Sequence, residues 1–112
     1  MQYLFRFGFE SPSEFRTNRA SDTDFESSEA VWIDAASADD ALEWGRLVAE
    51  EFVRQLFGQA GIENYSWLGT SFAHWIEDEE TVLSWARTSP DVLHADFGRM
   101  PDLTALVASR SA

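Results

Sequence analysis

Residues 37–57 carry an apolar stripe with the period of an α-helix, and a stripe of this length must be buried against another layer of structure. Ser37 is a good N-cap, and two aspartates follow it in the first turn, where the helix dipole favours anions. Gly45 lies near the middle of the stripe, where glycine costs about 1 kcal/mol relative to alanine. We expect this glycine to allow close approach of the helix to a sheet, and Gly58 to end the helix.

Two segments, residues 2–9 and 29–35, alternate apolar and polar side chains, which is typical of strands with one buried face. The residues between them, 10–28, are polar and rich in serine. They predict a long loop whose composition allows mobility. Two strands joined in this way are expected to pair antiparallel.

The second half of the chain leaves alternatives open. Residues 63–77 predict one strand or two, with a break near Gly69. Residues 78–87 fit either a helix or a strand, and we favour a hairpin in which 72–77 returns as 81–87.

Two prolines suggest the starts of further helices. Pro90 fits the first position of a helix that stops before Gly98, and Pro101 fits the start of a C-terminal helix.

Together these elements predict one α+β domain over residues 1–112. It would be a two-layer sandwich, with a mostly antiparallel four-stranded sheet, the long helix 37–57 and a C-terminal helix. The order strand, strand, helix, strand, strand, helix resembles a ferredoxin-like fold whose last strand has moved to the front. That fold hosts many activities, so the resemblance implies none in particular.

Acidic residues dominate the charge of the chain. Its 112 residues contain 20 acids and eight basic residues, all arginines, for a net charge of −12. Ten of the acids fall within residues 21–52, where Arg46 is the one basic residue. Such a field repels nucleic acids and anionic membranes and attracts a basic partner.

Other classes of function are also disfavoured by composition. The chain has no cysteine, which excludes disulfides and thiolate metal sites. No basic stretch precedes an apolar run at the start of the chain, and no apolar run approaches the roughly 20 residues of a membrane helix. We therefore expect a cytoplasmic protein that binds neither membranes nor nucleic acids.

The stretch FAHWIEDEE, residues 72–80, places a histidine directly before four acids. On a regular strand, His74 and Glu77 point to opposite faces, so they would not converge on a metal or a substrate. We therefore predict that His74 is a packed structural residue. His94 has no nucleophile motif beside it, and we predict no catalytic residue, no metal and no cofactor.

The favoured functional hypothesis is a small, non-enzymatic interaction module that binds a basic protein, such as a toxin, a nuclease or a regulator. Its partner-binding surface would comprise acids of the long helix together with the acidic residues 22–29. The helix acids are Asp39, Glu43, Glu50 and Glu51.

The alternative hypothesis is a homodimer that encloses a small-molecule pocket, either as a binding protein or as an enzyme. If the sheet faces follow strand parity, Trp32, Trp75 and Trp85 share the face opposite the long helix, and Trp67 joins them if its parity is preserved. His74 or His94 would then supply any acid–base chemistry. The alternatives are that residues 89–112 fold over these tryptophans, or that the parity is shifted by one residue.

Overall fold

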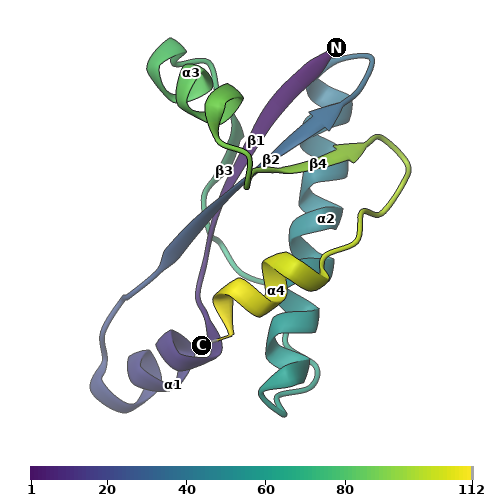
Figure 1. Cartoon of the computed structure of the whole chain (residues 1–112). Coiled ribbons are helices and arrows are strands. Elements are labelled where there is room, and N and C mark those ends of the chain that lie inside the picture. The colour runs from purple at the N-terminus through teal and green to yellow at the C-terminus, as the bar shows by residue number, and fades with distance from the viewer. Residues whose placement is uncertain (112) are drawn as a thin grey trace.

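The computed structural model describes residues 1–111 and centres on a four-stranded sheet (Figure 1). The strands are β1 (Gln2–Phe9), β2 (Ser27–Asp34), β3 (His74–Ile76) and β4 (Leu93–Asp96), in the order β3-β1-β2-β4. β1 pairs antiparallel with β2 and with β3, whereas β4 pairs parallel with β2. The predicted α+β class, the mostly antiparallel sheet and the two strands in the first third of the chain are confirmed.

The long helix, α2 (Ala38–Gln59), lies on one face of the sheet and buries its apolar stripe there, as predicted (Figure 1). The Ser37 hydroxyl caps it by accepting a hydrogen bond from the Asp40 amide at 3.1 Å. Gly45 lies directly over β1, and a Cβ at this position would lie 2.4 Å from the Phe5 ring. Close approach of helix and sheet is therefore the reason for this glycine.

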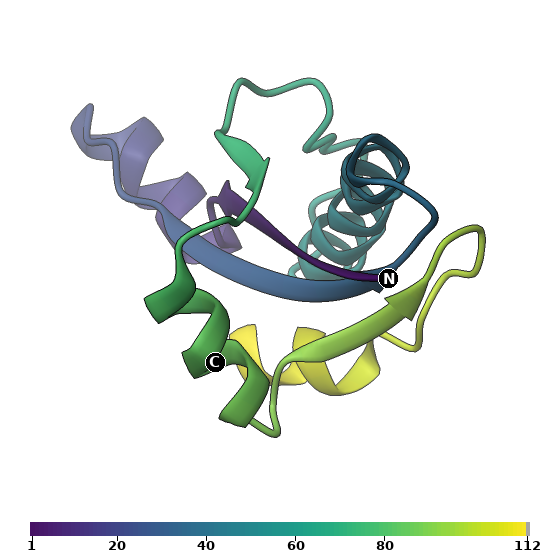
Figure 2. The same ribbon diagram turned by 90° about the horizontal axis from the view of Figure 1, so that it is seen from above.

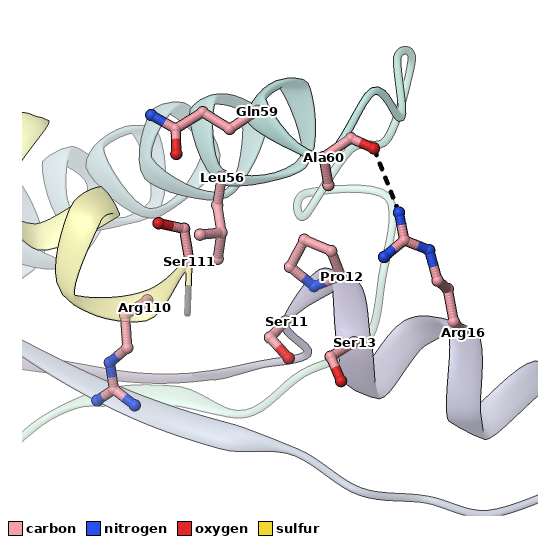
Figure 3. A pocket seen from close by; sticks show the side chains of 9 residues that line it. All are labelled: Ser11, Pro12, Ser13, Arg16, Leu56, Gln59, Ala60, Arg110 and Ser111. Atoms are coloured by element: carbon pink, nitrogen blue, oxygen red, sulfur yellow. Dashed lines mark hydrogen bonds between the residues drawn. The ribbon is translucent and has the colours of Figure 1, made fainter.

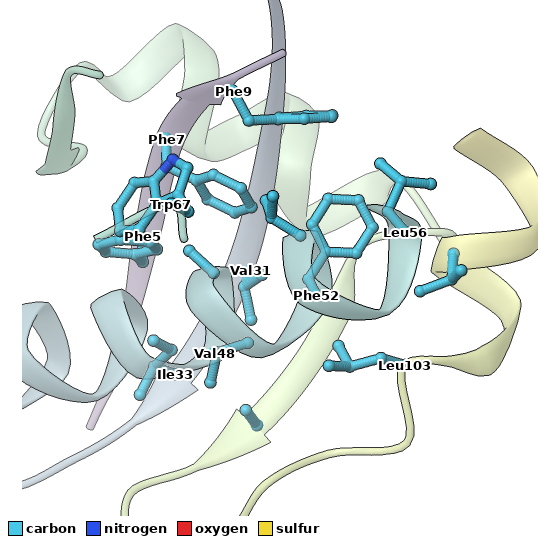
Figure 4. Close-up of a cluster of buried hydrophobic side chains, with 14 of the residues drawn as sticks. Phe5, Phe7, Phe9, Val31, Ile33, Val48, Phe52, Leu56, Trp67 and Leu103 are labelled. Carbon is cyan, nitrogen blue, oxygen red and sulfur yellow. The ribbon is translucent and has the colours of Figure 1, made fainter. Parts of the chain in front are cut away.

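Phenylalanines of β1 and aliphatic residues of β2 and α2 form the main core (Figure 4). The fully buried large side chains include Phe5, Phe7, Phe9, Val31, Ile33, Val48, Phe52 and Leu56. Burial of such side chains contributes about 1.5–3 kcal/mol each, which makes this layer the main source of stability.

The end of α2 differs from the prediction, because the helix does not stop at Gly58. Gly58 stays within the helix, and the left-handed turn falls at Gly61, which has a φ of 76°. The Gly61 and Ile62 amides then bond back to the Gly58 and Phe57 carbonyls at 3.1 and 3.0 Å. A glycine permits this turn at either site, so composition alone did not select one.

The prediction of a long loop over 10–28 is wrong, because a helix, α1 (Pro12–Ser21), occupies half of it. A capping box starts this helix: Ser11 Oγ accepts from the Glu14 amide at 3.1 Å, and Glu14 Oε1 accepts from the Ser11 amide at 2.8 Å. Only the first residue of α1 is buried, so the helix has no apolar stripe for a periodicity argument to detect. The Phe15 ring is its main contact with the core.

The predicted hairpin between 72–77 and 81–87 is also wrong, because the second segment forms α3 (Glu80–Thr88). This helix lies on the face of the sheet opposite α2 (Figure 2). Val82, Leu83 and Ala86 share one side of it and cover Leu4, Ala30 and Trp32. The spacing of these three residues is helical. Packing against Leu4, Ala30 and Trp32 therefore selects the helix over the strand that the sequence also allowed.

Most of the strand predicted over 63–77 is absent, and only β3 forms. Side-chain bonds hold the residues before it. Glu50 accepts hydrogen bonds from Ser66 Oγ at 2.8 Å and from the Leu68 amide at 2.9 Å. Between them, Trp67 is buried in the main core, where its Nε1 donates to the Gly8 carbonyl at 2.8 Å.

The helix expected to begin at Pro90 is replaced by a turn and β4, and a left-handed turn at Gly98, with φ of 83°, follows the strand. The predicted C-terminal helix is present as α4 (Thr104–Arg110), which packs against α2. The observed element order is therefore not the one that resembled a permuted ferredoxin-like fold. Within residues 1–111, no helix combines the length and apolarity needed to cross a bilayer.

Candidate partner-binding surface

The loop between α1 and β2, residues 22–26, is held by the side-chain amide of a single asparagine. Asn18 Nδ2 donates to the Phe25 carbonyl, and Asn18 Oδ1 accepts from the Phe25 amide, both at 2.9 Å. The hydroxyl of Thr23 donates to the same Oδ1 at 2.9 Å. Asp22 supports the turn into this loop with a left-handed conformation, φ 52°. The 22–26 loop is therefore fixed by bonds to its own helix.

This arrangement presents an aromatic side chain to solvent. Phe25 is 56% exposed although its backbone is bonded on both sides, and it stands between Asp24 and Glu26. An exposed aromatic residue whose backbone is already ordered loses little backbone entropy when a partner covers it. It therefore has the properties of a binding anchor.

An acidic groove adjoins the 22–26 loop. Glu10, Asp24 and Glu26 line a hollow of about 620 Å³ whose other wall is residues 69–73. No arginine lines it among the described residues. We call this hollow the acidic groove, and its chemistry suits a cationic side chain.

Two neighbours hold Glu10 in place. Tyr65 Oη donates to Glu10 Oε1 at 2.9 Å, and Asn18 Nδ2 donates to Glu10 Oε2 at 3.1 Å. Burial raises the pKa of Tyr65 well above its ordinary value, and the bond to Glu10 raises it further, so the phenol stays a donor throughout the physiological range. The same asparagine thus orders both the loop and one wall of the groove.

The four acids of α2 predicted to bind a partner fall into two groups. Glu50 tethers residues 66–68, and Glu51 forms an ion pair with Arg54. The hydrogen bond from Arg54 lowers the pKa of Glu51. Asp39 and Glu43 are exposed and form no ion pair within the described part of the chain. Only this second pair is free for a partner.

The tryptophans do not gather on one open face. Trp32 is only 5% exposed beneath α3, where its Nε1 donates to the Ala86 carbonyl at 3.3 Å. Trp67 lies on the opposite side of the sheet, in the main core. Trp75 and Trp85 remain 38% and 56% exposed. Helix α3, and not the segment 89–112 alone, covers this face.

His74 packs against aromatic rings of the main core. Its ring lies 6.2 Å from that of Phe5 and 5.3 Å from that of Trp67, and its Nδ1 is 3.1 Å from the Phe72 carbonyl. Glu77 bonds instead to Arg6, at 3.0 Å. Among residues 1–111, no group of three or more histidines and acids is arranged to hold a metal ion.

His94 lies exposed on β4, opposite Trp32 in the strand register. It is far from His74 in the sheet order, since β4 and β3 form opposite edges. The two histidines therefore do not share a site.

A second hollow, of about 330 Å³, lies between α1, α2 and α4 (Figure 3). Two arginines line it, but both have partners. Arg16 donates to the Ala60 carbonyl at 3.2 Å, and Arg110 turns away to Glu29 and the Ser28 carbonyl, each at 2.9 Å (Figure 3). Because neither guanidinium is aimed into it, this hollow is a weaker candidate than the acidic groove.

Sequence reasoning included residues 22–29 in the acidic surface but missed Phe25, Asn18 and Glu10. One signal was present: Phe25 is the only large apolar residue between Phe15 and Val31. Comparisons with protein-family models, with curated proteins and with solved structures find no match.

Proposed function

We propose that this protein is a non-enzymatic interaction module that binds a basic protein through the 22–26 loop and the acidic groove. The observation that carries the proposal is the Asn18 clamp, which holds the backbone of the exposed Phe25 between Asp24 and Glu26, two acids that line the groove. A basic toxin, nuclease or regulator in the cytoplasm is the kind of partner that we expect.

Charge and aromatic contact would play different roles in this interaction. The net charge of −12 steers a basic partner and raises its association rate. Phe25 would be covered on binding, as aromatic hot-spot residues are at protein interfaces. Glu10, Asp24 and Glu26 would then pair with arginine or lysine side chains of the partner.

The surface of α2 is a less suitable main site. Its exposed side carries Arg46 and Arg54 among the acids, and two of the four predicted acids already have intramolecular partners. Of the four acids in the original hypothesis, Asp39 and Glu43 remain accessible to a partner.

The homodimer hypothesis has less support. Its pocket needs Trp32, which is buried under α3. Each copy also carries a net charge of −12, and repulsion between two such copies opposes self-association.

The test compares two variants that change the net charge equally. A partner is captured from the host's lysate at low salt, identified and purified. Its affinity is then measured for the wild type, for Asp24→Lys/Glu26→Lys and for Asp39→Lys/Glu43→Lys. We expect the loop variant to weaken binding at least tenfold, whereas the α2 variant should change it less than threefold. Phe25→Ala should also cost about tenfold, the usual effect of removing an aromatic anchor.

Equal effects of the two charge variants would show that only the overall charge matters, and would contradict a specific loop site. A larger effect of the α2 variant would return the site to Asp39 and Glu43.

A further inference from the structure

One edge of the sheet offers unpaired backbone groups. β3 is an outer strand, paired on one side with β1. The Gly8 amide donates to the Ala73 carbonyl at 2.8 Å, and the Glu77 amide donates to the Leu4 carbonyl at 2.8 Å. Residues 73, 75 and 77 therefore direct their amides and carbonyls toward β1. His74 and Ile76, which alternate with them, direct theirs toward the open edge.

The opposite edge of the sheet, formed by β4, lies closer to a helix. Leu93 of β4 lines the same hollow as Leu106 of α4, so this helix lies near the β4 edge. Covering an outer strand with a helix is a common way to prevent pairing with another chain. Within residues 1–111 no strand pairs with the outer side of β3, although α2 contacts this strand.

The segment that leads into β3 also borders the acidic groove. Residues 69–73, which form one wall of the groove, are the residues that immediately precede β3. Glu26 lies over the end of β1 beside Ala73, since its Oε1 is 3.5 Å and the Ala73 carbonyl oxygen 3.8 Å from where a Cβ on Gly8 would be. A strand added antiparallel to β3 would therefore run with its C-terminal half along residues 69–73, where long basic side chains could reach across to the groove acids.

From these observations we infer that the basic partner binds as an extended segment that adds a strand to the edge of β3, with its arginines or lysines in the acidic groove. The inference rests on the proposed function, because the groove acids supply the charge that selects a basic segment. Backbone bonds to His74 and Ile76 would give affinity, and side-chain contacts with Glu10, Asp24 and Glu26 would give specificity, as in other strand-addition complexes.

The experiment uses a synthetic peptide, acetyl-Thr-Val-Thr-Val-Arg-Thr-Arg-amide, titrated against the full protein. A peptide with glutamate in place of both arginines is the charge control. Two further peptides carry backbone N-methyl groups at alternate positions, one set on the odd residues and one on the even residues. Amide hydrogen exchange of His74 and Ile76 is followed in the same samples by NMR.

A paired strand directs only every second amide toward β3, so one methylated peptide should bind at least tenfold more weakly than the other. Exchange at the His74 and Ile76 amides should slow when the unmodified peptide binds. Equal affinities of the two methylated peptides, or unchanged exchange at both amides, would overturn strand addition.

The charge control separates this result from the proposed function. If the arginine peptide binds, the glutamate peptide does not, and the two methylated peptides bind alike, the acidic groove stands and strand addition fails. If both arginine and glutamate peptides bind equally, or neither binds, the acidic groove fails as the site and the strand inference fails with it.

Discussion

At the scale of single residues, Gly45 shows how one missing side chain sets the distance between helix and sheet. Its backbone lies so close to β1 that a Cβ would overlap the fully buried Phe5 ring. Alanine normally stabilises a helix by about 1 kcal/mol relative to glycine, but overpacking of a core costs about 1–3 kcal/mol. We expect Gly45→Ala to lower the free energy of unfolding by about 1–2 kcal/mol, because the overlap with the Phe5 ring costs more than the helix propensity of alanine gains.

Urea denaturation of Gly45→Ala and Gly58→Ala gives a matched comparison within one helix. A Cβ at Gly58 would meet nothing within 4 Å, so this control should gain about 0.5–1 kcal/mol from helix propensity. Equal stabilisation of both variants would show that α2 can shift away from β1 at no cost.

At the scale of elements, what the sequence predicted depended on whether burial leaves a periodic pattern. β1, β2 and α2 bury continuous faces, and the pattern located all three. α1 was missed because it is held by a capping box and one aromatic contact, which leave no stripe. For α3, helix and strand periods fitted equally well, and the choice came from packing on Leu4 and Trp32, residues far away in sequence.

The candidate site followed the same rule. The acidity of residues 22–29 was readable from composition. The rigidity of the loop was not, because it depends on Asn18 bonding a residue seven positions later. The groove likewise needs residues 69–73 to reach the loop, and irregular segments carry no periodic signal.

The entry into α3 gives a prediction on pH. Arg6 Nη1 donates to Glu77 Oε1 at 3.0 Å, and this bond lowers the pKa of Glu77 below its ordinary value of 4.5. A carboxyl whose pKa is lower in the folded state stabilises the fold above its unfolded pKa, and the contribution is lost as the pH falls through the folded pKa. Glu77→Gln should therefore cost about 1 kcal/mol near pH 7.

Urea denaturation at pH 7 and at pH 3 measures this contribution. The difference between wild type and Glu77→Gln should shrink on going to the lower pH. Asp78→Asn, at an exposed carboxylate without an ion pair in the described structure, should behave like wild type at both. A pH-independent cost of Glu77→Gln would show that the side chain acts through packing and not through its charge.

At the scale of the whole molecule, the net charge of −12 acts on folding and on binding with opposite sign. Five ion pairs within residues 1–111 use only a quarter of the acids, so repulsion among the remaining acids opposes the compact state. Salt screens this repulsion over a Debye length of about 10 Å at 0.1 M. It screens attraction to a basic partner by the same mechanism.

Raising sodium chloride from about 20 to 500 mM should therefore raise the melting temperature and weaken peptide or partner binding, since both effects come from one field. Thermal unfolding followed by circular dichroism gives the first quantity, and calorimetric titration of the arginine peptide gives the second. A melting temperature that falls with salt would mean that the ion pairs outweigh the repulsion. Binding that persists at high salt would instead assign most of the affinity to Phe25 and to backbone pairing, because neither depends on charge.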